Sequence, residues 1–238
     1  MDAALLKEIN RLRTARKAVA VITDIETGSG RLIEGDTAQA DPLAEIAVEA
    51  FRSGRSRMVD LEGKPHFLNV HLPPVRIVVI GAVHISQVLA PMARLTGFDV
   101  TVIDPRTAFA TPERFAGTEL VAEWPDEVLA ARPLDAYTAL VAVTHDPKID
   151  DGPLKAALEA GCFYVGALGS RKTHAARCER LAALGLGPDR IGRIAAPIGL
   201  DIGAATPAEI AVAILGQVIE SLRQRPLAQG TETQRRAG

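Results

Sequence analysis

Glycine, carboxylate, imidazole and cationic side chains follow directly after several apolar segments of this 238-residue chain. Backbone amides at helix starts and nearby cations bind phosphate groups, whereas carboxylates accept hydrogen bonds from hydroxyl and N–H groups. These residue types therefore predict a pocket for an anionic small molecule, with binding rather than catalysis as its task. The candidate ligand-binding residues are Gly81, His84, Asp104, His145, Asp146, Gly166, Gly169, Ser170, Arg171, Lys172 and Asp201.

The turn Gly169-Ser170-Arg171-Lys172 combines two features that favour an anion. Its small residues leave backbone amides accessible where a helix is predicted to begin, and two cations stand beside them. It is not a P-loop, because Arg171 occupies the place where that motif needs its second glycine. The alternative interpretation is a capped, solvated helix start whose two cations only face water.

Residues 81–86, Gly-Ala-Val-His-Ile-Ser, follow an apolar strand and open a predicted helix, which is the position of a dinucleotide-binding turn. That turn uses three glycines, for a tight bend, for close approach to a pyrophosphate and for helix packing. Only Gly81 is present, and Val83 and Ser86 take the other two places. Because a branched side chain at position 83 would crowd a phosphate, the sequence favours weak or absent NAD(P) binding.

Two further candidates have more than one interpretation. Asp104 lies 104 − 81 = 23 residues after Gly81, near the spacing of an acid that binds a ribose hydroxyl. It could instead complete a turn that continues into Pro105. His145-Asp146 could form an acid–base pair or part of a metal site, but no ligand spacing in the chain completes such a site. We therefore expect these residues to contact a ligand, and we assign no catalytic or metal residue.

From residue 75 onward, apolar strands alternate with amphipathic helices. Runs such as residues 77–80, Ile-Val-Val-Ile, suit strands that are covered on both faces. This alternation predicts an α/β fold, a Rossmann-like parallel sheet flanked by helices, which binds ligands at the carboxyl ends of its strands. The expected strands are 76–80, 100–103, 119–122, 139–143 and 163–165, with a brief extended piece at 194–197. The expected helices are 85–96, 126–130, 152–159, 171–184 and 207–222.

Residues 1–72 follow a different pattern, which predicts a smaller N-terminal α+β domain. We expect a helix at 2–16, strands at 18–23, near 32–33, at 57–60 and at 66–71, and a helix that begins at Asp41-Pro42. Pro73-Pro74 marks the boundary, because consecutive prolines favour an extended chain. Residues 75–223 form the Rossmann-like domain, and the polar, aperiodic residues 224–238 are expected to form a flexible tail.

Composition narrows the class of partner. A formal net charge of −2 offers no basic field for nucleic acid or an anionic membrane. No apolar stretch approaches the ~20 residues of a membrane span, and we expect no targeting segment. Two cysteines, Cys162 and Cys178, make neither a disulfide framework nor a zinc site. These observations favour a soluble, cytoplasmic protein.

Four segments, taken together and in this order, resemble the XdhC/CoxI family. They are Gly81-Ala82-x-His84, Thr144-His145-Asp146-Pro147-Lys148, residues 166–174 and residues 197–211. The resemblance implies a cofactor chaperone more than an enzyme: a protein that binds molybdenum cofactor, as molybdopterin or its dinucleotide, and assists its sulfuration or insertion into a xanthine dehydrogenase or carbon monoxide dehydrogenase-type enzyme. It implies this client molybdoenzyme and a cysteine desulfurase as partners. We expect a homo-oligomer, such as a dimer.

The N-terminal region departs from the family pattern. Family members usually carry a Gly-Ser-x-Pro-Arg stretch and a Ser-Gly-Gly-Cys stretch, whereas residues 1–74 contain neither stretch and no cysteine. The chain thus looks like a short form without the N-terminal Cys motif. Two other functions stay open: an NAD(P)-binding oxidoreductase, which Val83 and Ser86 disfavour, and a non-catalytic scaffolding or regulatory protein with a degenerate pocket.

Overall fold

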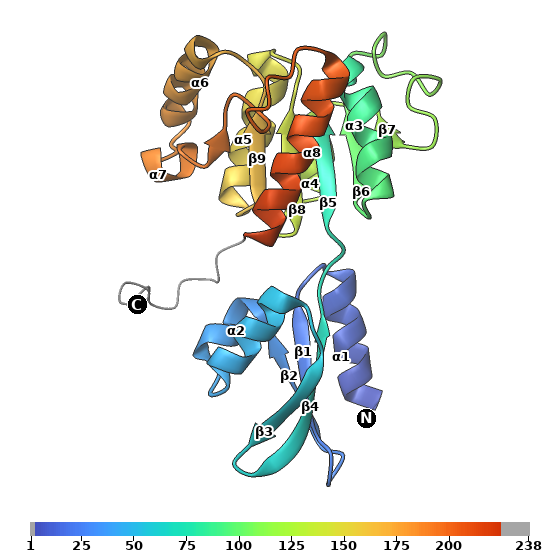
Figure 1. Ribbon diagram of the computed structural model, residues 1–238, viewed down its shortest axis with the longest axis vertical. Coiled ribbons are helices and arrows are strands. Elements are labelled where there is room, and N and C mark those ends of the chain that lie inside the picture. Colours follow the sequence, from blue (N-terminus) through green and yellow to red (C-terminus); the bar gives the residue numbers. More distant parts are fainter. Residues whose placement is uncertain (1–2, 225–238) are drawn as a thin grey trace. The chain divides into compact units, whose positions relative to one another are not determined.

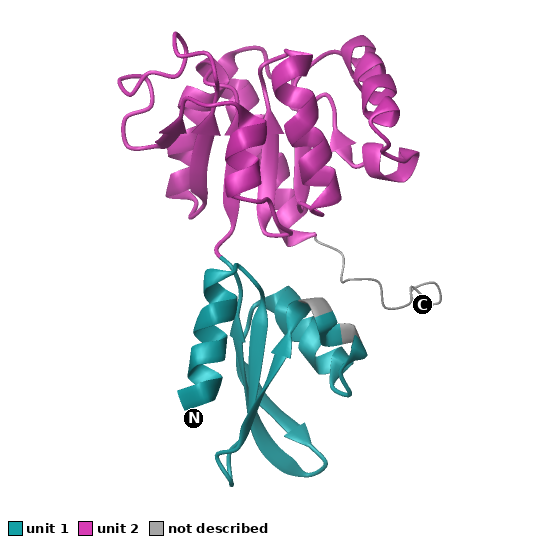
Figure 2. Ribbon diagram, turned by 180° about the vertical axis from the view of Figure 1, so that it is seen from behind, with its two compact units in different colours: residues 1–73, 225–238 teal, residues 74–224 magenta. Residues whose placement is uncertain are grey.

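The structure is a computed structural model that describes residues 3–224, without the side chains of Asp36 and Gln39. These residues form two compact units, one up to Pro73 and the other from Pro74 to Gln224 (Figure 2). Each unit has its own sheet and its own apolar core. Apart from Gln224, the expected tail lies outside the described residues.

The N-terminal unit is an antiparallel sheet of four strands in the order β2-β1-β4-β3, with a helix on each face. On one face of β1, Val21 packs with Leu12 of α1. On the other face, Ile22 packs with Ala50 of α2, as the two-residue period of a strand requires. The elements are α1 (Ala3–Thr14), β1 (Val19–Asp24), β2 (Gly30–Glu34), the 3-10 helix η1 (Gly35–Ala40), α2 (Ala44–Ser53), β3 (Arg57–Leu61) and β4 (Lys64–His71).

The start of α2 differs from the prediction. The helix begins at Ala44 rather than at Asp41-Pro42. Asp41 instead forms a two-bond ion pair with Arg31 of β2, at 2.7 and 2.8 Å, and accepts a hydrogen bond from the backbone of Leu43 at 2.8 Å. The Arg31 guanidinium is the main reason that the pKa of Asp41 falls to about 2. A contact with a neighbouring strand, which local sequence does not reveal, therefore takes the place of the expected cap.

The second unit is a parallel sheet of six strands in the order β10-β9-β8-β5-β6-β7 (Figure 1). The chain runs outward from β5 to β7 and then returns to β8, so the strand order reverses between β5 and β8. This arrangement confirms the predicted Rossmann-like α/β fold. The elements are β5 (Arg76–Ile80), α3 (His84–Leu95), β6 (Asp99–Ile103), β7 (Glu119–Val121), α4 (Pro125–Ala131), β8 (Thr138–Ala142), α5 (Pro147–Glu159), β9 (Tyr164–Ala167), α6 (Arg171–Ala183), α7 (Pro188–Ile191), β10 (Ile194–Ala195) and α8 (Pro207–Arg223).

Helices cover both faces of this sheet, which explains the unbroken apolar strands. Ile77 and Val79 of β5 belong to the core that includes α3 and α8, which lie side by side in Figure 1. Val78 and Ile80 belong to the opposite core, which includes residues of α4, α5 and α6. Because the middle strands are buried on both faces, the sheet can present polar residues only at the ends of its strands.

Helix α5 begins at Pro147, five residues before the predicted start at Gly152. The Asp146 carboxylate caps it by accepting a hydrogen bond from the backbone of Lys148 at 3.0 Å, and Pro147 occupies the first helical position, where no N–H is needed. Gly152 and Pro153 resemble a helix break in the sequence. In the structure Gly152 lies inside the helix, where a Cβ would collide with Asp126 of α4.

Gly166 lies inside β9 rather than in the turn after it, where the sequence placed it. A Cβ at this position would lie 2.7 Å from the Ile198 side chain and closer still to the Tyr164 hydroxyl. We predict that Gly166→Ala lowers the free energy of unfolding by about 1–3 kcal/mol through overpacking, as measured by urea denaturation. The loss should be smaller in a Tyr164→Phe background. An unchanged free energy of unfolding would contradict this packing.

Candidate functional site

The carboxyl ends of β6, β5, β8 and β9 lie next to one another at one edge of the parallel sheet. The Gly81 amide donates to the Ile103 carbonyl at 2.8 Å, and the Leu168 amide donates to the Ala142 carbonyl at 2.8 Å. In open α/β sheets ligands bind outside this edge, where the strand order reverses. The structure thus brings the turns that carry Gly81, Asp104, His145 and Gly169 to one edge of the sheet.

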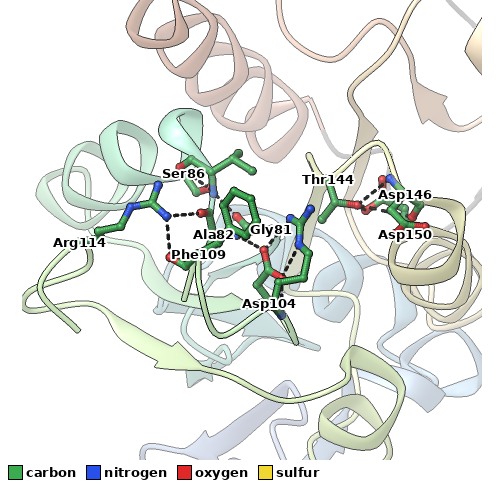
Figure 3. Close-up of polar contacts among 11 residues, drawn as sticks. Gly81, Ala82, Ser86, Asp104, Phe109, Arg114, Thr144, Asp146 and Asp150 are labelled. Atoms are coloured by element: carbon green, nitrogen blue, oxygen red, sulfur yellow. Dashed lines mark hydrogen bonds and ion pairs between the residues drawn. The ribbon is translucent and has the colours of Figure 1, made fainter. Parts of the chain in front are cut away.

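A buried carboxylate joins the first two of these turns (Figure 3). The side chain of Asp104 is 0% exposed. Its Oδ2 accepts from the Ala82 amide and from Arg106 Nη2, both at 2.8 Å, and its Oδ1 accepts from Arg106 N and Nε, both at 2.9 Å. Burial works to raise the pKa of Asp104, but the hydrogen bonds from Arg106 and Ala82 outweigh it and hold the pKa below its ordinary value. Asp104 therefore stays charged and ties the turn after β5 to the end of β6.

Arg106 is the partly exposed member of this ion pair. Its side chain is 30% exposed, and its guanidinium lies over the Phe109 ring, 4.6 Å from the centroid. The spacing left two roles open for Asp104, a ribose hydroxyl as ligand or completion of a turn. Four N–H donors already surround its two oxygens, and one of them is the Arg106 amide, as the turn alternative requires. A ligand at this turn would meet the guanidinium of Arg106. The sequence Asp104-Pro105-Arg106 does not reveal which of the two charged side chains is buried.

The turn after β5 is well formed despite its two missing glycines. Gly81 has φ +119°, and a Cβ there would lie 2.8 Å from Thr144 Cγ2. Val83 has φ −103°, and its half-buried side chain packs against the core around α3 and α8 instead of standing free before the turn. The Ser86 hydroxyl accepts from the Val83 amide at 2.9 Å and donates to the Gly81 carbonyl at 2.5 Å. His84 is exposed as the first residue of α3.

The loop between β6 and β7 is attached to the same turn by Arg114, a residue that the sequence analysis did not single out (Figure 3). Arg114 Nη1 donates to the carbonyls of Ala82 at 3.1 Å and Phe109 at 2.6 Å, and Nη2 donates to Gln87 Oε1 at 2.9 Å. These bonds hold the residues around Phe109 close to the start of α3.

Thr144 organises the turn after β8. Its hydroxyl donates to Asp150 Oδ1 at 2.7 Å and accepts from the Asp146 amide at 3.0 Å (Figure 3). His145 is exposed and has φ +65°, which few residues other than glycine adopt. Between residues 3 and 224, no hydrogen bond joins the His145 and Asp146 side chains, and no three His, Cys, Asp or Glu residues are grouped to hold a metal ion. The turn therefore offers polar groups for contact without a formed acid–base pair.

The turn after β9 has the features that the sequence suggested. Gly169 has φ +141°, and the Ser170 hydroxyl caps α6 by accepting a hydrogen bond from the Thr173 amide at 3.2 Å. Arg171 and Lys172 are exposed. Both interpretations of this turn, a capped helix start and an anion-binding turn, fit this geometry. Asp201 is exposed in the segment before α8, and no contact in the described part of the chain joins it to the other candidates.

Two buried charged residues lie behind this edge, and neither was among the site residues predicted from the sequence. Asp150 of α5 is 1% exposed and Arg177 of α6 is 2% exposed. Burial is the main cause that raises the pKa of Asp150 to about 6, against the hydrogen bond from Thr144 and the charge of Arg177. Arg177 stands four residues before the buried Leu181, so a charge on the apolar stripe of α6 was the available signal.

Fold and site define a Rossmann-type α/β protein whose polar turns meet where the strand order reverses. Residues 77–218 match the model of the XdhC Rossmann domain. The chain therefore belongs to the XdhC family, as its four motifs suggested.

Several known proteins are similar to this chain. It is 31% identical over 153 residues to a protein of Bacillus subtilis described as a probable xanthine dehydrogenase subunit, covering 64% of this chain and 44% of that protein. It is 30% identical over 146 residues to the molybdenum cofactor insertion chaperone PaoD of Escherichia coli, covering 61% and 40%. The matched region thus spans less than half the length of these relatives. A crystal structure of a xanthine dehydrogenase from Bacillus halodurans shares the fold, with a TM-score of 0.61 and 24% identity over 96% of this chain and 68% of that one.

Asp150→Asn should stabilise the protein at neutral pH. Because the pKa of this carboxyl rises from 3.8 to about 6 on folding, the folded chain binds its proton more tightly than the unfolded chain. The protonated carboxyl therefore stabilises the folded chain at low pH. This stabilisation is lost as the pH rises from 3.8 to about 6, at ~1.4 kcal/mol for each pKa unit. Urea denaturation at pH 7.5 should show a gain of roughly 1–3 kcal/mol for the variant. At a pH below 4 the gain should disappear; a gain of equal size at both pH values would refute this account.

Proposed function

We propose that this chain is an accessory protein that binds molybdenum cofactor and assists its sulfuration or its insertion into a xanthine dehydrogenase or carbon monoxide dehydrogenase-type molybdoenzyme. The observation that carries this proposal is that the four family motifs lie at or just after the carboxyl ends of β5, β8, β9 and β10, which are neighbouring strands of one parallel sheet. The relative PaoD, whose name describes a molybdenum cofactor insertion chaperone, matches 61% of this chain and supports this assignment.

The chemistry of this edge suits molybdopterin, which carries a phosphate group and a pterin ring with N–H donors. The half-buried Arg106 and the exposed Arg171 and Lys172 offer charge for the phosphate. The amides at the start of α6 add to this charge, because the positive end of the helix dipole favours anions. We propose that Gly81, His84, Asp104, His145, Asp146, Gly166, Gly169, Ser170, Arg171, Lys172 and Asp201 form or border the cofactor site.

The thiols of Cys162 and Cys178 do not take the place of the N-terminal cysteine that family members usually carry. Cys162 is wholly buried, and burial raises the pKa of its thiol to about 12, so it is a poor metal ligand. Cys178 lies half-buried on α6 with its sulfur 3.4 Å from His174 Nε2. We therefore propose that the cofactor is held mainly by contacts to its phosphate and pterin rather than by a thiolate bond to molybdenum.

The partners proposed for this role are the client molybdoenzyme and a cysteine desulfurase. We also propose that the chain forms a homo-oligomer, such as a dimer, and that it acts in the cytoplasm. Within residues 3–224 every helix is too short or too polar to cross a membrane.

A delivery assay tests the proposal. Purified chain loaded with molybdenum cofactor should restore activity to a cofactor-free xanthine dehydrogenase-type enzyme faster than an equal amount of free cofactor. NAD and NADP, titrated in parallel, should bind weakly or not at all. Tight NAD(P) binding, with neither cofactor binding nor delivery, would favour the oxidoreductase alternative and contradict the proposal.

We predict that Arg171→Ala with Lys172→Ala weakens binding of molybdopterin at least tenfold, because charge-assisted contacts are worth roughly 1.5–3 kcal/mol each. Calorimetric titration at several salt concentrations should also show a shallower salt dependence for this variant. Lys7→Ala with Arg13→Ala, which removes two exposed cations of α1, is the control for net charge and should bind like the wild type. Equal affinities and equal salt slopes in all three proteins would remove this turn from the site.

A further inference from the structure

Arg177 is a buried cation whose hydrogen-bonding capacity is only partly used. Its Nη2 donates to the Leu168 carbonyl at 2.8 Å, but within the described chain its Nε and Nη1 have no hydrogen-bond partner. The residue is 2% exposed, and a guanidinium keeps its proton in proteins. Buried N–H groups without a partner are unfavourable, particularly on a charged group. The arrangement therefore calls for an acceptor that the chain itself does not provide.

The nearest unused acceptor belongs to Asp150, and it does not close the gap. Asp150 Oδ1 accepts from Thr144, whereas Oδ2 has no partner among the described residues. The charges of Asp150 and Arg177 act on each other, so the groups are close, but no hydrogen bond joins them. The neighbouring Asp151 is already committed to Arg180, with bonds of 2.5 and 3.1 Å. Arg177 is thus a cation without a dedicated carboxylate.

The guanidinium lies at the N-terminal end of α6, a helix of 13 residues. Gly169 stands beside it: a Cβ at this position would lie 3.2 Å from Thr173 and 3.7 Å from Arg177 Nη2. The residues that follow, from Ser170 to Thr173, are exposed, so this end of the helix faces solvent. Helix amides, which favour anions, and the unused donors of Arg177 therefore occur at the same end of the helix.

We propose that Arg177 is the buried anchor of an oxyanion site at the first turn of α6, which binds a tetrahedral group such as phosphate, and that Asp150 is the internal counter-charge that opposes the bound anion. The inference rests on the proposed cofactor role only for the identity of the natural ligand. The exposed Arg171 and Lys172 then assist entry of the anion, while Arg177 holds it.

The site should depend on pH through Asp150. The charged and titratable groups that act on Arg177 are Asp150 and Asp151 of α5, and His174, Cys178 and Arg180 of α6. Burial already raises the pKa of Asp150 to about 6, and a bound anion would raise it further. Anion affinity should therefore be highest below about pH 6, where Asp150 is neutral, and should fall as the pH increases above this value.

Sulfate is the probe for this site, because it is tetrahedral and keeps its charge between pH 5 and pH 8. At constant ionic strength, calorimetry should show saturable binding of sulfate to the full chain. Arg177→Gln should weaken it at least tenfold, as expected for loss of a buried charged contact. Arg190→Gln, which removes an exposed cation of α7 from the same unit, is the control for net charge and should bind sulfate like the wild type. Undiminished binding by folded Arg177→Gln would overturn the proposal.

Asp150→Asn provides a second test, which holds even where Arg177→Gln does not fold. Its sulfate affinity should equal that of the wild type at pH 5 and exceed it at pH 8. Absence of saturable sulfate binding to the wild type, or a wild-type affinity that does not fall with pH, would contradict the proposal and leave the buried groups to an internal water molecule.

The outcome for this site is separable from that of the proposed function. If molybdopterin is bound and delivered while sulfate is not bound, the inference about Arg177 fails and the cofactor role stands. If sulfate binds through Arg177, competition by molybdopterin identifies the cofactor phosphate as the occupant. Simultaneous binding of both identifies a free oxyanion instead.

Discussion

The buried carboxylate of Asp104 is the interaction on which the geometry of the polar edge depends. A charge removed from water is tolerated only when its hydrogen-bonding capacity is filled, and here the Ala82 amide and three N–H groups of Arg106 fill it. This arrangement fixes the turn before α3 and leaves the Arg106 side chain 30% exposed. Next to Ala82, Gly81 lies close against Thr144 of the turn after β8.

A second pair of buried charges lacks complete hydrogen bonding. Asp150 and Arg177 are buried without complete partners, an arrangement that lowers stability at neutral pH. Perturbed, incompletely paired groups of this kind concentrate at functional sites, where they are retained for binding. One ion pair at this edge therefore has its hydrogen bonds complete, whereas the two buried charges behind the edge keep N–H groups and a carboxylate oxygen without a partner among the described residues.

The sequence predicted the fold of the second unit well, because its strands are buried on both faces and therefore read as unbroken apolar runs, as in β5 and β8. It predicted the edge for a related reason: polar residues can follow such strands only where they end. The predicted start of helix α5 was too late. Gly152 resembles a helix break in the sequence, and its packing against α4 is a tertiary contact that the local sequence does not reveal. The ion pair of Arg106 with Asp104 and the burial of Arg177 were also missed, since both depend on how a turn folds back on its neighbouring residues.

The central claim is that molybdenum cofactor binds at the carboxyl edge of the parallel sheet. Amide chemical-shift mapping of the full chain during titration with molybdopterin tests this claim most directly. The account predicts that the largest changes occur in the turns around Gly81, Arg106, His145 and Gly169. Changes confined to residues 3–73, with these turns unaffected, would contradict it.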